Sequence, residues 1–148
     1  MSQTPASPAA PPPYGLPLTL AQAKRVMAAA EQEANANGWP VVIAIVDAGA
    51  HLVLLQRLEN AQLGSVPIAQ QKAATAVKFR RDTKVLDDQL AAGGAALHLL
   101  MLEGLCACEG GVPLLLDGRV VGGIGVSGVR SGQDAQIAAA GARALTGA

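Results

Sequence analysis

The chain begins with apolar residues at helical spacing and continues with apolar runs that are separated by turns. The residues with helical spacing are Leu20, Ala23, Met27, Ala30 and Ala34. They predict a helix over residues 18–37, because residues three or four apart share one helix face. Thr19 and Gln22 fit a capping box at its start, and Gly38 with Pro40 fits its end.

Two strands are predicted next. Residues 41–47 are apolar and mostly β-branched, and residues 51–58 follow the turn sequence Asp47-Ala48-Gly49-Ala50. This pattern favours an antiparallel hairpin. Strict alternation along the second strand would place its side chains in two sets on opposite faces. One set is His51, Val53, Leu55 and Arg57, and the other is Leu52, Leu54 and Gln56.

The middle of the chain is predicted to be mostly helical. A helix over residues 66–79 follows Ser65, which is a suitable N-cap. A shorter helix is predicted over residues 83–90, and the Gly93-Gly94 pair breaks it. Residues 95–103 fit either a helix or a strand.

The last part of the chain predicts further strands and a closing helix. The three strands are expected over residues 105–108, 112–116 and 119–126. Asp117-Gly118 joins the last two, because Asp-Gly suits the positive φ angles of a tight type I′ turn. A helix over residues 131–145 follows, with Ser131 as its N-cap. This order of elements predicts an α+β domain, an antiparallel sheet covered by helices.

Length and composition predict one folded domain. The 148 residues are too few for two full cores, and 51% hydrophobic against 15% charged residues excludes a disordered chain. Residues 1–17 are rich in proline, so we expect a flexible tail there and a single domain over residues 18–148. Such an apolar surplus in a small domain predicts a homo-oligomer.

The charge balance excludes several classes of partner. There are 11 Lys and Arg against 11 Asp and Glu, whereas a nucleic-acid binder needs a basic excess. Aromatic residues are 2%, too few for stacking on bases. No apolar run reaches the roughly 18–20 residues of a membrane helix, so no membrane partner is expected. The first residues do not have the pattern of a secretory signal, so we expect a cytoplasmic protein.

The sequence Gly123-x-Gly125-x-x-Gly128 has the spacing of a dinucleotide-binding fingerprint. That mechanism also needs a further strand and an acidic residue about 20 positions on. The chain after Gly128 is predicted to be only helix and tail. The glycines therefore favour close approach of the backbone to another element. The turn over residues 128–131 is a candidate cradle for a carboxylate or phosphate.

Four side chains are candidate metal ligands. His51 starts a strand beside a turn, and His98 lies in an apolar stretch. Cys106 and Cys108 are expected on the same face of a strand. Small buried hydrophobes are the favoured interpretation of these two residues, with a thiolate ligand as the alternative. Of these four, His51, His98 and Cys106 are the preferred metal candidates, and their spacing forms no zinc motif.

Lys72 and Asp47 are the candidate catalytic residues. Lys72 lies at the edge of a small-residue helix face, from which its ammonium can reach a cleft. Asp47 either pairs with it or caps the hairpin turn. General acid–base catalysis requires a pKa that burial or a neighbouring group has tuned.

Several stretches, taken in order, resemble one family. They are Val46-Asp47-Ala48-Gly49 with His51-Leu52-Val53, Leu63-Gly64-Ser65, Lys72-Ala73 with Thr75-Ala76, Gly110-Gly111-Val112-Pro113-Leu114, and residues 122–128 with Gln133-Asp134. Over residues 18–145 their order and spacing resemble the GlcG/HbpS family. That family includes the C-terminal domain of PduO-type corrinoid adenosyltransferases.

The resemblance implies a profilin-like α+β fold with a five-stranded antiparallel sheet flanked by helices, and a multimer that is often an octamer. Some family members bind haem, so haem or a related tetrapyrrole is expected in a cleft near subunit interfaces. The residues expected at that cleft are His51, His98, Cys106, Gly110, Gly111, Ser127 and Gly128.

Two alternatives stay open. One is an enzyme or accessory protein in the catabolism of a small organic acid or aromatic compound, with Lys72 and Asp47 lining the site. The other is an assembly module that binds no ligand.

Overall fold

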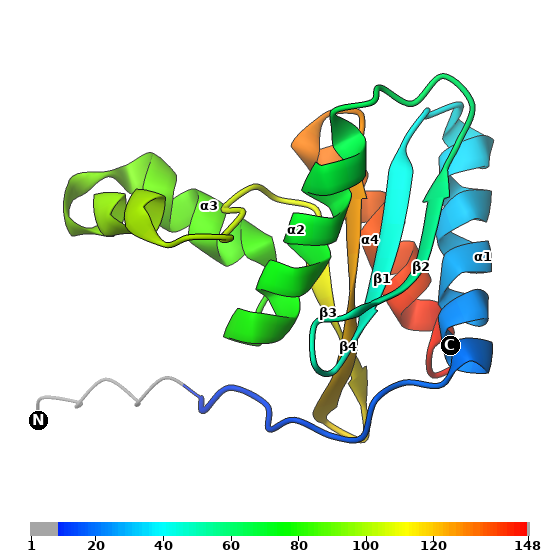
Figure 1. The fold of residues 1–148 in the computed structure, drawn as a ribbon, viewed down its shortest axis with the longest axis horizontal. Coiled ribbons are helices and arrows are strands. Elements are labelled where there is room, and N and C mark those ends of the chain that lie inside the picture. The colour runs from blue at the N-terminus through cyan, green and yellow to red at the C-terminus, as the bar shows by residue number, and fades with distance from the viewer. Residues whose placement is uncertain (1–8, 148) are drawn as a thin grey trace, which may run out of the picture.

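In a computed structural model, which describes residues 9–147, one sheet has helices on both faces (Figure 1). The helices are α1 (Leu20–Asn37), α2 (Ser65–Phe79), α3 (Thr83–Ala92), the 3-10 helix η1 (Gly94–Met101) and α4 (Ser131–Ala144). The strands are β1 (Val42–Asp47), β2 (Leu52–Arg57), β3 (Gly111–Leu116) and β4 (Arg119–Ser127). The predicted α+β class is confirmed. Within residues 9–147, no helix has both the length and the apolar character that a bilayer crossing requires.

The described part of the chain forms a sheet of four antiparallel strands in the order β2-β1-β4-β3. The prediction of five strands is wrong, because residues 105–108 form a loop between η1 and β3. Helix side chains accept hydrogen bonds from this region. The N–H of Cys106 donates to Thr75 Oγ1 at 3.0 Å, and the N–H of Glu109 donates to Asp87 Oδ2 at 2.9 Å. These bonds satisfy backbone donors without a strand ladder.

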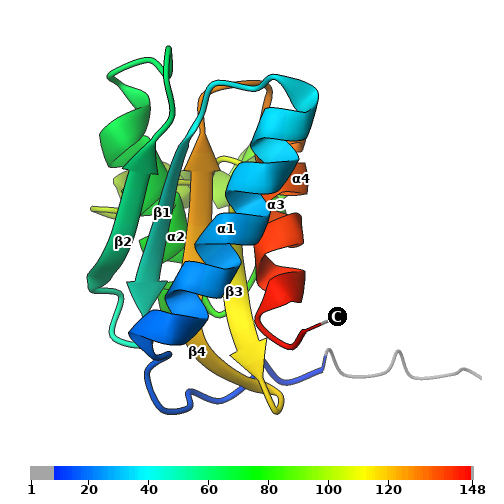
Figure 2. The same cartoon turned by 90° about the vertical axis from the view of Figure 1, so that its right-hand side faces the viewer.

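The two faces of the sheet are packed differently. α1 and α4 cover one face and α2 covers the other (Figures 1 and 2). The core between the sheet, α1 and α4 holds the larger side chains, among them Val26, Ile43, Ile45, Ile124 and Ile137. Smaller side chains of α2 face the sheet from the other side, among them Ala69 and Ala73.

Glycines in β4 allow α2 to lie very close to the sheet. A Cβ on Gly123 would be 2.7 Å from the carbonyl oxygen of Ala73, and a Cβ on Gly125 would overlap the carbonyl oxygen of Ala69. The predicted role of these glycines in close backbone approach is therefore confirmed. Gly128 is followed by α4, without a further strand in the described residues, so a dinucleotide-binding unit is not formed.

Local predictions at the two ends of α1 and at the β3–β4 turn are confirmed. The N–H of Gln22 donates to Thr19 Oγ1 at 3.1 Å, and the N–H of Thr19 donates to Gln22 Oε1 at 2.7 Å. α1 thus begins with the predicted capping box, and Gly38 ends it in the left-handed conformation with φ of 67°. Asp117 and Gly118 have φ angles of 51° and 72°, both positive as a type I′ turn requires.

The predicted alternation along β2 is wrong at Leu52. Ile45 pairs with Leu54, but the next residue, Val46, pairs with Leu52, so Val53 is an extra residue in β2. Paired residues share one face of a sheet, and Leu52 and Leu54 therefore lie on opposite faces. Nothing in an all-apolar run marks such a β-bulge in advance.

Two predicted N-caps are displaced by one residue. Ser65 and Ser131 are the first residues of α2 and α4, and the caps are Gly64 and Arg130. Ser65 is fully buried, so its side chain belongs to the interior. At α4, the side chain of Gln133 accepts the N–H of Arg130 at 3.2 Å, and no serine hydroxyl is needed there.

The N-terminal segment contacts the end of the sheet. The N–H of Gly15 donates to the carbonyl of Val120, and the N–H of Val120 donates to the carbonyl of Pro13, both at 2.9 Å. The Tyr14 hydroxyl donates to the carbonyl of Val77, in the last turn of α2, at 2.8 Å. Residues 13–15 are thus attached to β4 and α2. Residues 1–8 of the predicted flexible tail lie outside the described residues.

Candidate functional site

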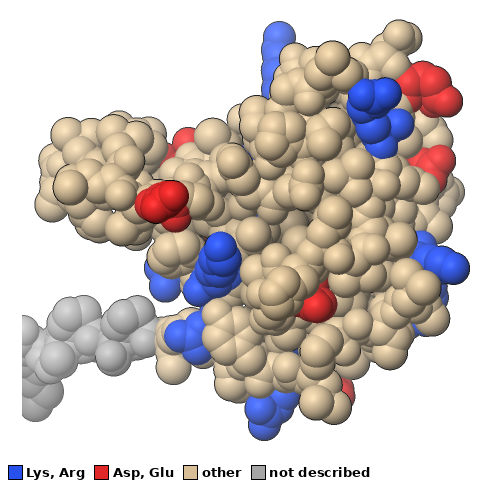
Figure 3. Space-filling model, viewed as in Figure 1, with Lys and Arg blue, Asp and Glu red and all other residues tan. Residues whose placement is uncertain are grey.

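Residues 83–102, which comprise α3 and η1, form an arm that projects from the rest of the molecule (Figure 1). Residues 89–102 include no charged side chain, and the outer end of the arm is free of charge on the face seen in Figure 3. Its exposed large apolar side chains are Val85, Leu97, Leu100, Met101 and Leu102. An exposed group of apolar side chains marks a candidate interaction site.

His98 lies among these apolar side chains on η1. Because a 3-10 helix has three residues per turn, His98 and Met101 lie on the same side of it. The Nδ1 atom of His98 contacts the carbonyl oxygen of Ala95. A carbonyl oxygen can only accept a hydrogen bond, so in the neutral ring this contact requires the proton on Nδ1 and leaves the lone pair on Nε2. The exposed ring therefore offers Nε2 to a metal, and its orientation is set by a backbone carbonyl, as in many metal-binding histidines.

Cys106 and Cys108 line one pocket of about 250 Å³ beside the arm. Gln71 of α2 and leucines of α3, η1 and the following loop form most of its wall. Burial, and then the neighbouring Cys108 thiol, raise the pKa of Cys106 to about 11, while the Lys72 ammonium lowers it in part. The Cys106 thiol is therefore protonated at neutral pH. The expected strand face is absent, but the loop brings both cysteines to the same pocket.

Lys72 is buried between α2, β4 and α4. Its Nζ donates to the carbonyl of Val126 at 2.9 Å and to Asp134 Oδ2 at 3.1 Å. The Lys72 and Asp134 side chains are only 4% and 3% exposed. Burial raises the pKa of Asp134, and the adjacent ammonium opposes part of that rise. The partner of Lys72 is thus Asp134 in the first turn of α4, and of the two interpretations of Asp47 the pairing with Lys72 is wrong.

Three of the predicted cofactor-binding residues lie close to this ion pair. A Cβ on Gly110 would be 2.8 Å from Lys72 Nζ, and a Cβ on Gly111 would overlap the Lys72 carbonyl oxygen. The Ser127 hydroxyl donates to Ser65 Oγ at 3.1 Å. These residues pack α2 against the ends of β3 and β4, and all three are buried.

The predicted anion cradle at residues 128–131 already holds a carboxylate of the chain itself. The N–H of Val129 donates to Asp134 Oδ1 at 3.2 Å, and a backbone hydrogen bond from Gly128 also lowers the pKa of Asp134. Gly128 itself, with φ of 151°, packs against the backbone at Pro40 and Val41. Its place in the structure is therefore explained without an external anion.

Asp47 caps the β1–β2 turn, as the second sequence interpretation predicted. Its Oδ1 accepts two backbone N–H groups of the turn at 2.8 and 3.0 Å. Asp47 pairs with Gly122, whereas Lys72 bonds to Val126, four residues further along β4. At about 3.3 Å per residue, the two positions are separated by about 13 Å along the strand. The two candidate catalytic residues are therefore not brought together.

The three candidate metal ligands form no common cluster. The side chain of His51 is 83% exposed at the β1–β2 turn, and its Nδ1 lies 3.6 Å from Asp47 Oδ1. His98 lies on the arm, and Cys106 lines the pocket beside it. Among residues 9–147, no group of three or more His, Cys, Asp or Glu side chains is placed to hold one metal ion.

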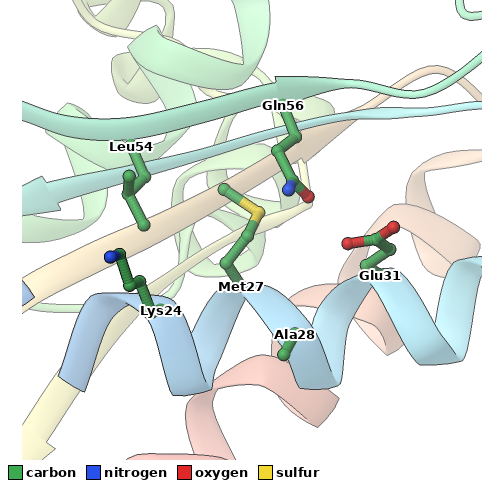
Figure 4. Close-up of a pocket in the computed structure, with 6 residues that line it drawn as sticks. All are labelled: Lys24, Met27, Ala28, Glu31, Leu54 and Gln56. Carbon is green, nitrogen blue, oxygen red and sulfur yellow. The ribbon is translucent and has the colours of Figure 1, made fainter. Parts of the chain in front are cut away.

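A second depression lies between α1 and β2 (Figure 4). Met27, Leu54 and Gln56 point toward one another there, with Lys24 and Glu31 at its sides. Its volume of about 220 Å³ is below the roughly 300–1,000 Å³ of most ligand pockets. This depression offers neither a histidine nor a thiol, so the arm is the stronger candidate for a metal-containing ligand.

Sequence reasoning missed residues that shape the site through long-range contacts. Asp134 and Thr75 were noted within the stretches that resemble a family, but neither was given a partner. Thr83 Oγ1, which accepts the N–H of Gly111 at 2.8 Å, was not singled out. These partners are 28 to 62 residues apart, and no local pattern indicates which polar side chains will meet.

The fold defines a class of small α+β domain, in which glycine-rich antiparallel strands pack closely under one helix and an apolar arm projects. A family model described as "Haem degrading protein HbpS-like" matches residues 18–143. The chain therefore belongs to the HbpS-like family, and the resemblance to GlcG/HbpS proteins is confirmed. Protein GlcG of Escherichia coli (strain K12) is 40% identical over 110 residues, which cover 74% of this chain and 81% of GlcG.

Solved structures share the fold over most of the chain. The crystal structure of HbpS has a TM-score of 0.82 and 31% identity, and the match covers 98% of both chains. The crystal structure of a complex between PduOC and haem has a TM-score of 0.80 and 32% identity, covering 87% of this chain and 95% of PduOC. The chain is thus similar to a protein whose structure includes haem.

Proposed function

We propose that this protein binds haem, or a related tetrapyrrole, on the apolar face of the arm, with His98 as the metal ligand. The observation that carries the proposal is the exposed His98 ring, whose Nδ1 contacts a backbone carbonyl and whose Nε2 is left to bind a metal. Membership of the HbpS-like family and the similarity to haem-bound PduOC support it. Haem would supply an iron that can bind an imidazole nitrogen, and His98 would hold it.

The side chains beside His98 suit a flat apolar macrocycle. Leu97, Leu100 and Met101 are 52%, 71% and 84% exposed. Covering apolar surface of this kind contributes about 25 cal/mol per Å². Because residues 89–102 carry no charge, a contact with this part of the arm would not require desolvation of an ion there.

The same surface supports self-association. The pocket beside the arm, at about 250 Å³, is smaller than the roughly 300–1,000 Å³ that usually encloses a small molecule. One chain therefore offers a surface and a shallow pocket, and we propose that a second copy completes the enclosure at the arm. The octamer implied by the family resemblance is one assembly of this kind.

The other predicted ligands fit less well. Cys106 would have to lose a proton against a raised pKa before it could act as a thiolate ligand. His51 lies beside the Asp47 carboxylate on a turn, with Leu52 as the exposed apolar residue next to it. His98 is the histidine with several exposed apolar neighbours, so we prefer it as the metal ligand.

Titration with haemin tests the proposal. We expect the wild type and His51→Ala to give the same shifted Soret band with the same end point. His98→Ala should lose that band, and free imidazole should restore it by replacing the missing ligand. A His98→Ala protein whose spectrum and end point equal those of the wild type would rule out ligation by His98.

The geometry gives less support to an enzyme or accessory protein for a small organic acid. Lys72 Nζ is buried and already bonds to two oxygen atoms. Asp47 lies beside Gly122, four residues along β4 from the Val126 carbonyl that Lys72 contacts. A substrate could reach Lys72 only if the elements packed around its ammonium moved apart. Haem binding is thus the function that the geometry supports best.

A further inference from the structure

The thiols of Cys106 and Cys108 are not used by the proposed haem site. Both line the pocket beside the arm, and a single residue separates them in the chain. Cys106 is partly buried and Cys108 is exposed, so the pair is open to solvent on one side. Two thiols separated by one residue in a leucine-walled pocket are a potential bidentate ligand for a soft cation.

The segment that carries the two thiols is held at both ends. Ahead of the pair, the N–H of Cys106 donates to Thr75 Oγ1 on α2 at 3.0 Å. Behind it, the N–H of Glu109 donates to Asp87 Oδ2 on α3 at 2.9 Å. Both acceptors belong to helices, so the position of this short loop is fixed before any ligand binds. Such preorganisation reduces the entropy lost when two ligands close on one ion.

The surroundings of the thiols decide which ion fits. Structural zinc sites need four ligands, and no group of three His, Cys, Asp or Glu side chains suited to one metal occurs within residues 9–147. Hard cations such as Mg²⁺ and Ca²⁺ need several oxygen ligands, whereas leucines make up most of this pocket's wall. Cu(I) is a soft cation that thiolates select, and it accepts as few as two of them.

We propose that Cys106 and Cys108 together bind one Cu(I) ion per chain. Two S–H bonds break, two S–Cu bonds form, two protons leave to solvent, and no atom changes its oxidation state. The resulting bis-thiolate carries one negative charge. Burial raises the pKa of the free Cys106 thiol, so the two S–Cu bonds must outweigh the cost of removing its proton, and the Lys72 ammonium opposes part of that cost. This inference does not depend on haem binding.

The test is a competition between haem-free protein and a chromogenic Cu(I) chelator, bathocuproine disulfonate. The full chain is reduced, its two free thiols are verified with Ellman's reagent, and Cu(I) is added without oxygen. We expect the wild type to withdraw one Cu(I) per chain from the chelator. Cys106→Ser and Cys108→Ser should each withdraw none, whereas Leu63→Ser, a serine at an exposed position outside the arm, should behave as the wild type does.

The exposed position of Cys108 protects the test against a folding artefact, because a serine there disturbs no buried contact. Far-UV circular dichroism of each variant checks the fold. The proposal is overturned if fully reduced wild type withdraws no Cu(I), or if the Cys106→Ser/Cys108→Ser double variant still does. Either result leaves the haem proposal unaffected, since no haem is present.

Discussion

Lys72 Nζ lies 3.1 Å from Asp134 Oδ2, and this buried ion pair joins the middle of α2 to the first turn of α4. The same ammonium bonds to the carbonyl of Val126 in β4, so one side chain connects three elements. Neither charge has access to water that could replace its partner. The pair is therefore expected to hold α2 in place over the sheet.

Replacing only Lys72 should destabilise the fold strongly. Lys72→Met leaves the Asp134 carboxylate buried without its cation, which typically costs about 3–5 kcal/mol. In the Lys72→Met/Asp134→Leu double variant both charges are absent. This variant should therefore lose less free energy of unfolding than Lys72→Met alone. Urea denaturation of the wild type, Lys72→Met, Asp134→Leu and the double variant measures these losses. Losses that simply add up would show that the two side chains do not interact.

The effect of Lys72→Met should also depend on pH. Burial raises the pKa of Asp134 in the folded protein, and removing the opposing ammonium raises it further. A group whose pKa is higher in the folded state favours folding while it is protonated, and this contribution disappears as the pH rises through the folded pKa. Lys72→Met should therefore lose less stability at about pH 4 than at about pH 7, relative to the wild type at each pH. Equal losses at both pH values would contradict this assignment.

Close packing of α2 on β4 predicts a large difference between two glycine substitutions. Gly125→Ala would force its Cβ into the Ala69 carbonyl, and overpacking of this kind costs about 3 kcal/mol or more against backbone. Gly132→Ala is the matched control, because its Cβ would meet nothing and it lies in the first turn of α4. It should stay within about 1 kcal/mol of the wild type. Thermal unfolding of both variants compares them, and similar melting temperatures would refute the packing argument.

Features decided by neighbouring residues could be predicted from the sequence. The Thr19 and Gln22 capping box, the Gly38 stop and the Asp117-Gly118 turn all depend on a few adjacent residues and were correct. The extra residue in β2 and the loop at residues 105–108 were not foreseen. Both depend on pairing with distant elements, and an apolar run has the same appearance whether it joins a sheet or not.

The candidate site was predictable only in part, for the same reason. His98 and the two cysteines were recognised as chemically capable side chains, but their grouping at the arm depends on how α3 and η1 fold back. The partner of Lys72 lies 62 residues away, at Asp134. Asp47 is nearer to Lys72 in the sequence and was an equally plausible partner. Only the register of β1 on β4, which pairs Asp47 with Gly122, excludes it in favour of Asp134.

The exposed arm predicts how self-association can be weakened. Leu100→Glu places a charge on the apolar face beside His98, and burying that charge in an interface would be costly. Leu63→Glu is the control, because Leu63 is 72% exposed and lies outside the arm, just before α2. Analytical ultracentrifugation should show smaller species for Leu100→Glu and an unchanged distribution for Leu63→Glu. Equal distributions for the wild type and Leu100→Glu would exclude an interface at this face.

Alkylation should distinguish the two cysteines by pH. The thiolate is the reactive form. Below the pKa of a thiol, its rate of alkylation therefore rises about tenfold for each unit by which the pH increases. The pKa of Cys106 is about 11, so its rate with iodoacetamide should keep rising well above pH 9. Peptide mapping by mass spectrometry resolves Cys106 from the exposed Cys108. A plateau for Cys106 below about pH 9 would contradict the raised pKa.

The most direct measurement for the haem proposal is a native mass spectrum of the protein mixed with haemin, because it reports the assembly and its retained ligand together. We expect a complex of several copies of the chain that retains haem in a fixed ratio to the chain. His98→Ala should keep the assembly but release the haem, and His51→Ala should keep both. A monomer without haem, or an equal haem load in the wild type and His98→Ala, would contradict the account.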